Sequence, residues 1–213
     1  MDNRDFWLKE VPVADGIHET WMTFSPSVTD VASIDRAKRD FLNLVSEGVE
    51  WTSVTVFNPS REASVADLVD VFKTFAPTAV LCGRGDLPFS FSATGYRFSD
   101  EGKKASVFER FKTESGTSGA VLRTPHSTVT TLDAAASSAK GFKKQAESFY
   151  DDVAQVLRDR KIPTRDFVRS WNFIDSILSR YAEFNEVRDA RFAKLGLSKN
   201  EAPAGTGIDC VLE

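Results

Sequence analysis

The chain has 213 residues, of which 41% are hydrophobic, so it is long enough to bury a core without disulfides or metals. Its 27 basic and 31 acidic residues give a net charge of −4. This mild acidity argues against a nucleic-acid-binding protein, which normally carries a clustered basic face. The two cysteines (Cys82, Cys210) and the two histidines (His18, His126) are far apart in the sequence. We therefore expect neither a disulfide framework nor a metal site.

The sequence also lacks the features of a membrane or cofactor-binding protein. No apolar run approaches the roughly 18 residues that would span a bilayer. The N-terminus, MDNRDFWLKEVP, carries charges where a signal peptide would be apolar. Gly83-Arg84-Gly85-Asp86 lacks the further glycines or the lysine of a nucleotide-binding loop, so we interpret it as a turn. We expect a soluble cytoplasmic protein without a cofactor, which binds neither nucleic acid nor membranes.

The N-terminal region, residues 1–88, is predicted to alternate strands and helices. Segments that are rich in β-branched and aromatic residues, or that alternate polar and apolar residues, predict strands. Apolar residues at spacings of three and four predict helices. The expected elements in chain order are a strand at 19–24, a helix at 30–46, a strand at 51–57, a helix at 64–75 and a strand at 79–82.

The same criteria predict a second domain over residues 89–213. Its expected elements are strands at 89–98 and 120–123, a charged helical piece at 107–112, a helix at 134–159, a strand at 166–173, a helix at 177–195 and a strand at 207–212. Both regions share the order strand, helix, strand, helix, strand, although no repeat is visible at the level of residues. An α+β fold is the prediction, with helices on one face of a mixed sheet.

Candidate ligand-binding residues lie on the strand predicted at 166–173. Alternation places Phe167, Arg169, Trp171 and Phe173 on one face, and Val168, Ser170 and Asn172 on the other. Arg169 could stack on the Trp171 indole or bind a ligand carboxylate. The alternative is that Trp171 belongs to the core and Arg169 reaches solvent at the edge of the strand.

Further candidates lie on the helix predicted at 177–195. One stripe of this helix contains Tyr181, Phe184, Asn185, Arg188 and Phe192. A buried amide or guanidinium is unfavourable without a partner, so Asn185 and Arg188 must meet a backbone carbonyl, an internal carboxylate, a partner subunit or a ligand. No nucleophile motif such as GxSxG occurs, so the catalytic residues stay unknown.

The pattern Arg-x-Trp-Asn-Phe-Ile, then Arg-Tyr-x-x-Phe-Asn-x-x-Arg, then Pro-Ala-x-Thr-Gly-Ile resembles the chorismatase family. The residues that carry the resemblance are Arg169, Trp171, Asn172, Ile174, Arg180, Tyr181, Phe184, Asn185, Arg188, Phe192, Pro203, Ala204, Thr206, Gly207 and Ile208. The resemblance covers the C-terminal region and corresponds to the N-terminal half of those enzymes. Leu178 departs from the pattern, because the family tends to carry an asparagine there.

The resemblance implies a mixed sheet of the RidA (YjgF) or chorismate-mutase-like type over residues 89–213, preceded by a smaller α/β region. It also implies a role in specialised metabolism, acting on chorismate or a related aromatic or cyclohexadiene carboxylic acid. The chemistry would be hydrolysis or elimination that releases pyruvate. The substrate-binding residues that it implies are Arg169, Trp171, Asn172, Tyr181, Asn185 and Arg188.

Two alternatives to an enzyme follow from the same resemblance. In the family, a second RidA-like domain follows the PAxTGI segment and supplies the principal acid, whereas this chain ends soon after Ile208. The chain could therefore be a non-catalytic binding or assembly subunit, or one chain of a split enzyme whose partner supplies that domain. A homo-oligomer is expected only by analogy with RidA trimers. No arginine follows Pro203, so the imine hydrolysis of RidA proteins is not expected.

Overall fold

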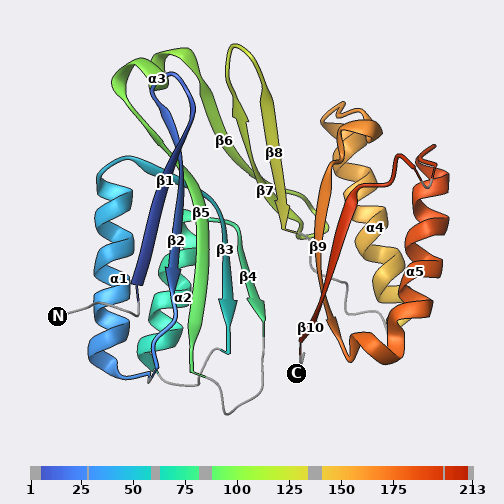
Figure 1. The fold of residues 1–213 in the computed structure, drawn as a ribbon, viewed down its shortest axis with the longest axis horizontal. Coiled ribbons are helices and arrows are strands. Elements are labelled where there is room, and N and C mark those ends of the chain that lie inside the picture. The colour runs from blue at the N-terminus through green and yellow to red at the C-terminus, as the bar shows by residue number, and fades with distance from the viewer. Residues whose placement is uncertain are drawn as a thin grey trace. The chain divides into compact units, whose positions relative to one another are not determined.

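The computed structural model describes residues 6–27, 29–58, 63–81, 88–133, 141–198 and 200–210 (Figure 1). The chain forms two compact units. The first contains Met1–Lys112 and Ser118–Asp133, and the second contains Thr113–Thr117 and Ala134–Glu213. The predicted Gly83–Asp86 turn, Cys82 and the start of the helix predicted at 134–159 lie outside the described residues.

The first unit contains a five-stranded mixed sheet in the order β1-β2-β5-β3-β4. Its elements are β1 (Phe6–Ala14), β2 (Ile17–Phe24), α1 (Val31–Ser46), β3 (Val49–Phe57), α2 (Ala63–Phe75), β4 (Thr78–Leu81) and β5 (Ser90–Phe98). β5 is antiparallel to both β2 and β3, while β3 and β4 are parallel. The short helix α3 (Asp100–Ala105) follows β5.

The core of this sheet forms beneath α1 and α2, because both helices carry an apolar stripe. Asp30 caps α1, since its carboxylate accepts a hydrogen bond from the Ser33 N–H at 2.7 Å. Phe41 of α1 stacks on Trp51 of β3, with ring centroids 5.0 Å apart, and both side chains are fully buried. The two helices therefore cover one face of the sheet (Figure 1).

A three-stranded antiparallel sheet completes the first unit. Its strands are β6 (Val107–Lys112), β7 (Ser118–Arg123) and β8 (Thr128–Asp133). Arg110 links it to β3, because its Nε donates to the Trp51 carbonyl at 3.1 Å and its guanidinium pairs with Glu50 at 2.7 Å. The helix predicted at 107–112 is wrong. All six of its residues pair with β7, and this pairing overrides the helical propensity of the charged segment.

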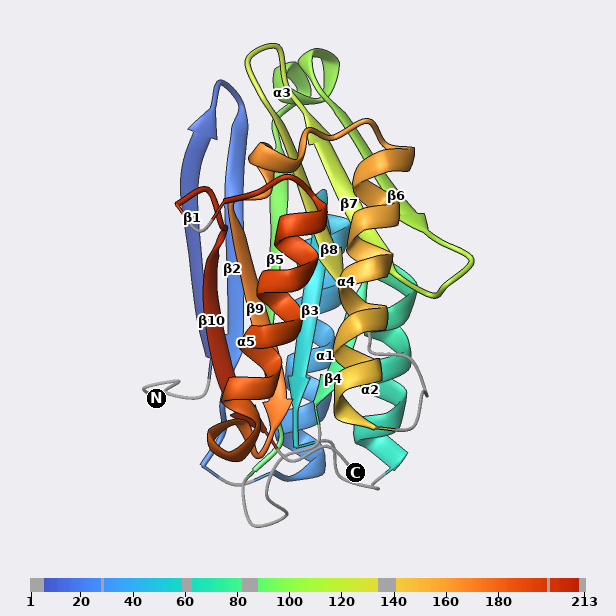
Figure 2. The same ribbon diagram turned by 90° about the vertical axis from the view of Figure 1, so that its right-hand side faces the viewer.

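The second unit is a two-stranded parallel sheet with two helices on one of its faces. Its elements are α4 (Phe142–Asp159), the 3₁₀ turn η1 (Thr164–Asp166), β9 (Arg169–Asp175), α5 (Ile177–Lys194) and β10 (Ala204–Cys210). Figure 2 shows α5 in front of these strands, with α4 beside α5. Tyr150 of α4, Ile174 of β9 and Phe192 of α5 belong to one buried cluster between the helices and the sheet.

The predicted α+β class is confirmed, since helices and several sheets are present. Two further strands differ from the prediction. Strand β1, residues 6–14, was not predicted, because its charged and exposed side chains give a weak pattern at the edge of a sheet. The strand predicted from Asp166 begins at Arg169, because residues 164–166 form the 3₁₀ turn. No helix among the described residues is long and apolar enough to cross a membrane.

Candidate functional site

Strand β9 carries an arginine and a tryptophan on the face opposite α4 and α5. The Arg169 guanidinium carbon lies 4.3 Å from the centroid of the Trp171 ring, which is within the range of a cation–π contact. Trp171 is 55% exposed, so it does not belong to the core. Arg169 is also exposed and makes no ion pair with the described residues. Of the alternatives that the sequence left open, the structure shows Arg169 stacked on an exposed Trp171, with the arginine side chain reaching solvent, where its charge remains available to an anion.

The opposite face of β9 carries a small buried polar cluster. Ser170 and Asn172 both point toward the helices, and the Asn172 Nδ2 donates to the Ser170 Oγ at 3.1 Å. Gly205 of β10 lies beside them, because a side chain at this position would come within 3.7 Å of the Ser170 Oγ. Asn172 is only 7% exposed, and its Oδ1 has no hydrogen-bond partner among the described residues. Asn172 and Trp171 thus lie on opposite faces of one strand.

Helix α5 carries the remaining candidates. The Arg188 Nε and a terminal guanidinium nitrogen donate to the Asp189 carboxylate at 3.0 and 2.8 Å. Arg188 therefore has the internal carboxylate partner that was one of the predicted alternatives. The Asn185 Oδ1 is buried and finds no hydrogen-bond partner in the part of the chain that the structure describes. Tyr181 is 55% exposed, and Leu178 close to it on the helix is 93% exposed.

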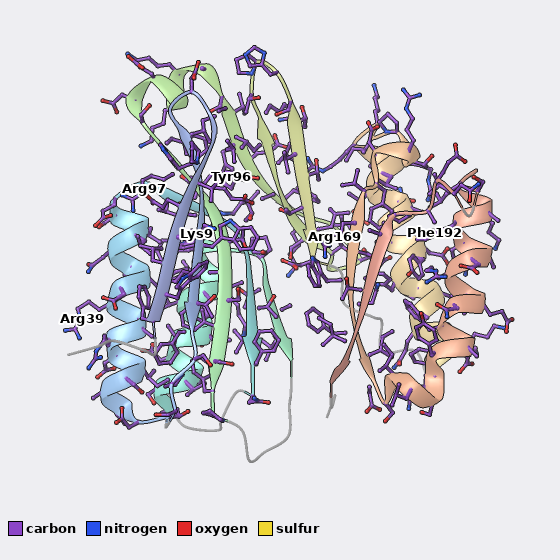
Figure 3. All side chains as sticks on the ribbon, in the orientation of Figure 1. Lys9, Arg39, Tyr96, Arg97, Arg169 and Phe192 are labelled. Carbon is purple, nitrogen blue, oxygen red and sulfur yellow. The ribbon has the colours of Figure 1, made fainter. Side chains whose placement is uncertain are left out.

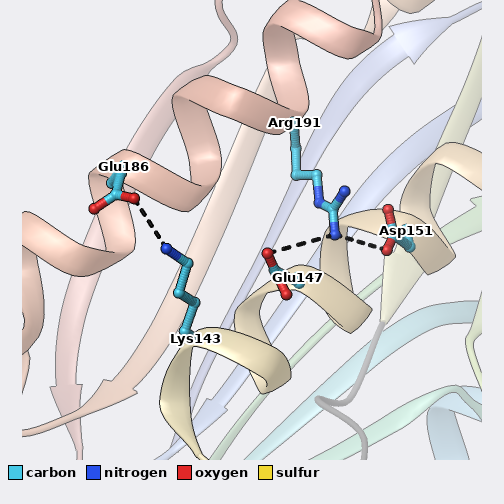
Figure 4. Close-up of polar contacts among 5 residues, drawn as sticks. All are labelled: Lys143, Glu147, Asp151, Glu186 and Arg191. Atoms are coloured by element: carbon cyan, nitrogen blue, oxygen red, sulfur yellow. Dashed lines mark hydrogen bonds and ion pairs between the residues drawn. The ribbon is translucent and has the colours of Figure 1, made fainter.

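The ends of α5 are fixed to neighbouring elements by further arginines. Arg180 lies over the Phe142 ring at 5.1 Å and is 3.4 Å from the Asp175 carboxylate. Arg191 approaches both Asp151 at 3.0 Å and Glu147 at 3.8 Å on α4 (Figure 4). These contacts set the position of α5 against α4, and their guanidinium groups are already engaged by carboxylates or rings.

Sequence reasoning missed Tyr150 of α4, which lies at the centre of this unit. Its ring contacts Phe149, Phe184 and Phe192, and its hydroxyl is buried with no hydrogen-bond partner within the described ranges. Burial is the main cause that raises the pKa of the Tyr150 hydroxyl above its ordinary value, so the group stays protonated. Tyr150 was predicted neither as a core residue nor as a site residue, because a tyrosine suits both environments.

The six predicted site residues thus fall into three groups. Arg169 and Trp171 form one group on the outer face of β9, and Figure 3 shows Arg169 on this strand, apart from Phe192 on α5. Asn172 lies on the inner face of β9. The third group, on α5, consists of Tyr181, Asn185 and Arg188.

Phe167 does not share the face of Trp171 as predicted. It follows the 3₁₀ turn rather than lying in the strand, and its ring packs at 6.1 Å against Phe192. The described residues also contain no group of three or more His, Cys, Asp or Glu side chains that could hold a metal ion.

Part of the chain matches the model of a known protein family. The family model described as "Chorismatase FkbO/Hyg5-like, N-terminal" matches residues 109–211. This part of the chain is similar to a chorismatase N-terminal domain. The matched stretch begins in β6 and ends after β10, so it contains β9, α5 and all six predicted site residues. The search of curated proteins gave no match.

Proposed function

We propose that this protein acts in the specialised metabolism of chorismate or a related aromatic or cyclohexadiene carboxylic acid. In this proposal, Arg169 and Trp171 bind the acid. The observation that carries it is the exposed Arg169 guanidinium over the Trp171 ring, in a segment similar to a chorismatase N-terminal domain. An unpaired guanidinium forms two parallel hydrogen bonds with a carboxylate, and an indole face accepts an unsaturated ring.

The remaining predicted residues have different roles in this proposal. Arg188 is neutralised by Asp189, so it contributes less to binding an anion than Arg169 does. Tyr181 is exposed on α5, which lies on the other face of β9 from Arg169 and Trp171, so we assign it no contact with an acid bound there. Asn172 supports β9 from its buried face. The RidA-like character of residues 89–213 is also part of the proposal, supported by the order of three strands, helix, strand, helix and strand from β6 to β10.

Release of pyruvate requires a group that gives a proton to the enolpyruvyl side chain and a group that activates water. The side chains of arginine, tryptophan and asparagine neither gain nor lose a proton near neutral pH. We therefore assign binding, and not proton transfer, to Arg169 and Trp171, and a supporting role to the buried Asn172. A partner that supplies the acid would complete the reaction.

A second candidate function is a binding or assembly subunit without catalysis of its own. It is favoured by two exposed side chains of the second unit, Leu178 and Tyr181, which lie one turn apart on α5. Large apolar side chains that gather at a surface commonly mark an interaction site. A subunit of this kind would bind the acid or a partner without releasing pyruvate.

Incubation with chorismate separates these functions. An enzyme releases pyruvate, which a coupled assay with lactate dehydrogenase and NADH detects. A binding subunit quenches its tryptophan fluorescence on adding chorismate, without releasing pyruvate. If chorismate causes neither pyruvate release nor a fluorescence change, the proposed substrate class is wrong.

A further inference from the structure

The Pro-Ala-x-Thr-Gly-Ile segment leads into strand β10, which runs beside the strand that carries Arg169 and Trp171 (Figure 1). The two strands are parallel, and their register pairs Ala204 with Arg169 and Thr206 with Trp171. Neighbouring strands are about 4.8 Å apart, so paired residues are close neighbours. A segment to which the proposed function gives no role therefore lies directly beside the two residues that bind the acid.

Two glycines show which face of the sheet each residue of β10 occupies. A side chain at Gly205 would come within 3.7 Å of the Ser170 Oγ, on the face that packs against the helices. A side chain at Gly207 would clash with Ile177 of α5, so this position faces the helices as well. Successive residues of a strand point to opposite faces. Thr206, between the two glycines, therefore lies on the outer face of the sheet.

The residues of β10 on this outer face differ in what they offer to a ligand. Ala204 places only a methyl group beside Arg169, so it leaves the guanidinium approachable. Ile208 is half-buried and apolar. Thr206 is also half-buried, and its hydroxyl makes no hydrogen bond with the described residues. Of these three side chains, that of Thr206 is the one that forms hydrogen bonds.

A cation, an aromatic ring and a hydroxyl thus lie next to one another on one face of two strands. The Arg169 guanidinium is held 4.3 Å from the centroid of the Trp171 ring, and Thr206 is the neighbour of Trp171 on β10. The guanidinium suits a carboxylate, and the indole suits an unsaturated ring. A hydroxyl beside the indole suits a polar substituent on that ring, because it both donates and accepts.

We propose that Thr206 is a specificity-determining residue of the acid-binding site, and that its hydroxyl forms a hydrogen bond with a hydroxyl group on the ring of the acid. This inference rests on the proposed function, because Arg169 and Trp171 must first bind the acid. The ligand is then a cyclic carboxylic acid with a hydroxylated ring, a class to which chorismate belongs. A site that hydrogen-bonds a ligand hydroxyl discriminates against the analogue that lacks it.

Two variants separate the hydroxyl of Thr206 from its shape. A β-branched side chain favours a strand whether or not its hydroxyl binds a ligand. Thr206→Val keeps the branched shape and removes the hydroxyl. Thr206→Ser keeps the hydroxyl and removes the methyl group. A role in binding therefore predicts that serine and threonine behave alike, whereas a role in strand stability predicts that valine and threonine do.

Calorimetric titration with benzoate, 3-hydroxybenzoate and 4-hydroxybenzoate tests the role of Thr206. The unmodified protein should bind at least one of the hydroxy acids about fivefold more tightly than benzoate, the effect of one neutral hydrogen bond. Thr206→Ser should keep this preference. Thr206→Val should lose it and bind all three acids with the affinity of benzoate. Arg169→Gln should weaken the binding of all three acids by a similar factor, because each carries the carboxylate.

The outcomes separate this inference from the proposed function. If the three acids bind through Arg169 with equal affinity, or if Thr206→Val keeps the preference, the role of Thr206 is wrong while the acid-binding site stands. Loss of benzoate binding in Thr206→Val would assign Thr206 a structural role and overturn the inference as well. If the unmodified protein binds none of the acids and does not bind chorismate, the proposed function fails, and the inference fails with it.

Discussion

Replacing Arg191 with methionine should loosen the contact between α4 and α5. The Arg191 side chain is only 16% exposed and lies 3.0 Å from Asp151 and 3.8 Å from Glu147. A hydrogen bond between charged groups contributes about 1.5–3 kcal/mol, and the exposure of Asp151 reduces this toward the lower value. The variant also leaves Glu147 and Asp151, four residues apart on α4, as an uncompensated like-charge pair that costs about 0.4 kcal/mol. We expect a total loss of about 2 kcal/mol.

Lys143→Met is the matched control, because Lys143 also joins the two helices, through Glu186 at 2.9 Å. Both of these side chains are about half exposed or more, so their ion pair should contribute little. Native-state hydrogen exchange of the α5 amides measures the effect on this unit directly. Arg191→Met should speed exchange at these amides by about thirtyfold, and Lys143→Met should change it far less. Equal effects of the two variants would refute the assignment of Arg191 as the principal link.

Three further predictions concern other parts of the chain. Burial raises the pKa of Asp133 to about 6, so the folded state favours its protonated form and loses that stability as the pH rises from about 4 through 6. In urea unfolding at pH 7, Asp133→Asn should have a higher free energy of unfolding than the unmodified protein, by at most about 3 kcal/mol. At pH 4 the two proteins should have the same free energy of unfolding. Gly95→Ala should lower the free energy of unfolding in urea by about 1–3 kcal/mol, because the alanine Cβ would lie 2.9 Å from the Trp51 Cα. An unchanged free energy of unfolding would contradict this packing. Ser170→Pro removes an N–H that bonds to β10, whereas the Trp171 N–H points away from β10. In the same hydrogen-exchange assay, Ser170→Pro should therefore destabilise the second unit more than Trp171→Pro.

Much of the fold follows from the sequence because its elements have clear periodicity. Helix α1 and strand β3 were predicted within two residues of their bounds, since each combines a regular apolar pattern with a turn signal. Strands β1 and β6 were not recognised, because most β1 side chains are exposed and three of the six β6 residues are charged, so neither strand shows a clear alternation of polar and apolar residues. Strand pairing is a tertiary interaction, and local propensity does not contain it.

The candidate site was predictable in its local geometry and not in its assembly. Alternation along β9 places Trp171 and Asn172 on opposite faces, and it brings Arg169 next to Trp171. The pairing of Arg188 with its neighbour Asp189 depends on side-chain conformation, which the sequence pattern does not contain.

Calorimetric titration of chorismate tests the proposed binding role of Arg169 most directly. The variants are Arg169→Gln and, as a control with the same change in charge, Arg165→Gln, whose exposed side chain lies in the 3₁₀ turn before β9. Loss of a charged hydrogen bond at an exposed site predicts about tenfold weaker binding for Arg169→Gln, with Arg165→Gln close to the unmodified protein. Equal affinity in all three proteins, or no binding by any of them, would contradict a carboxylate site at Arg169 and Trp171.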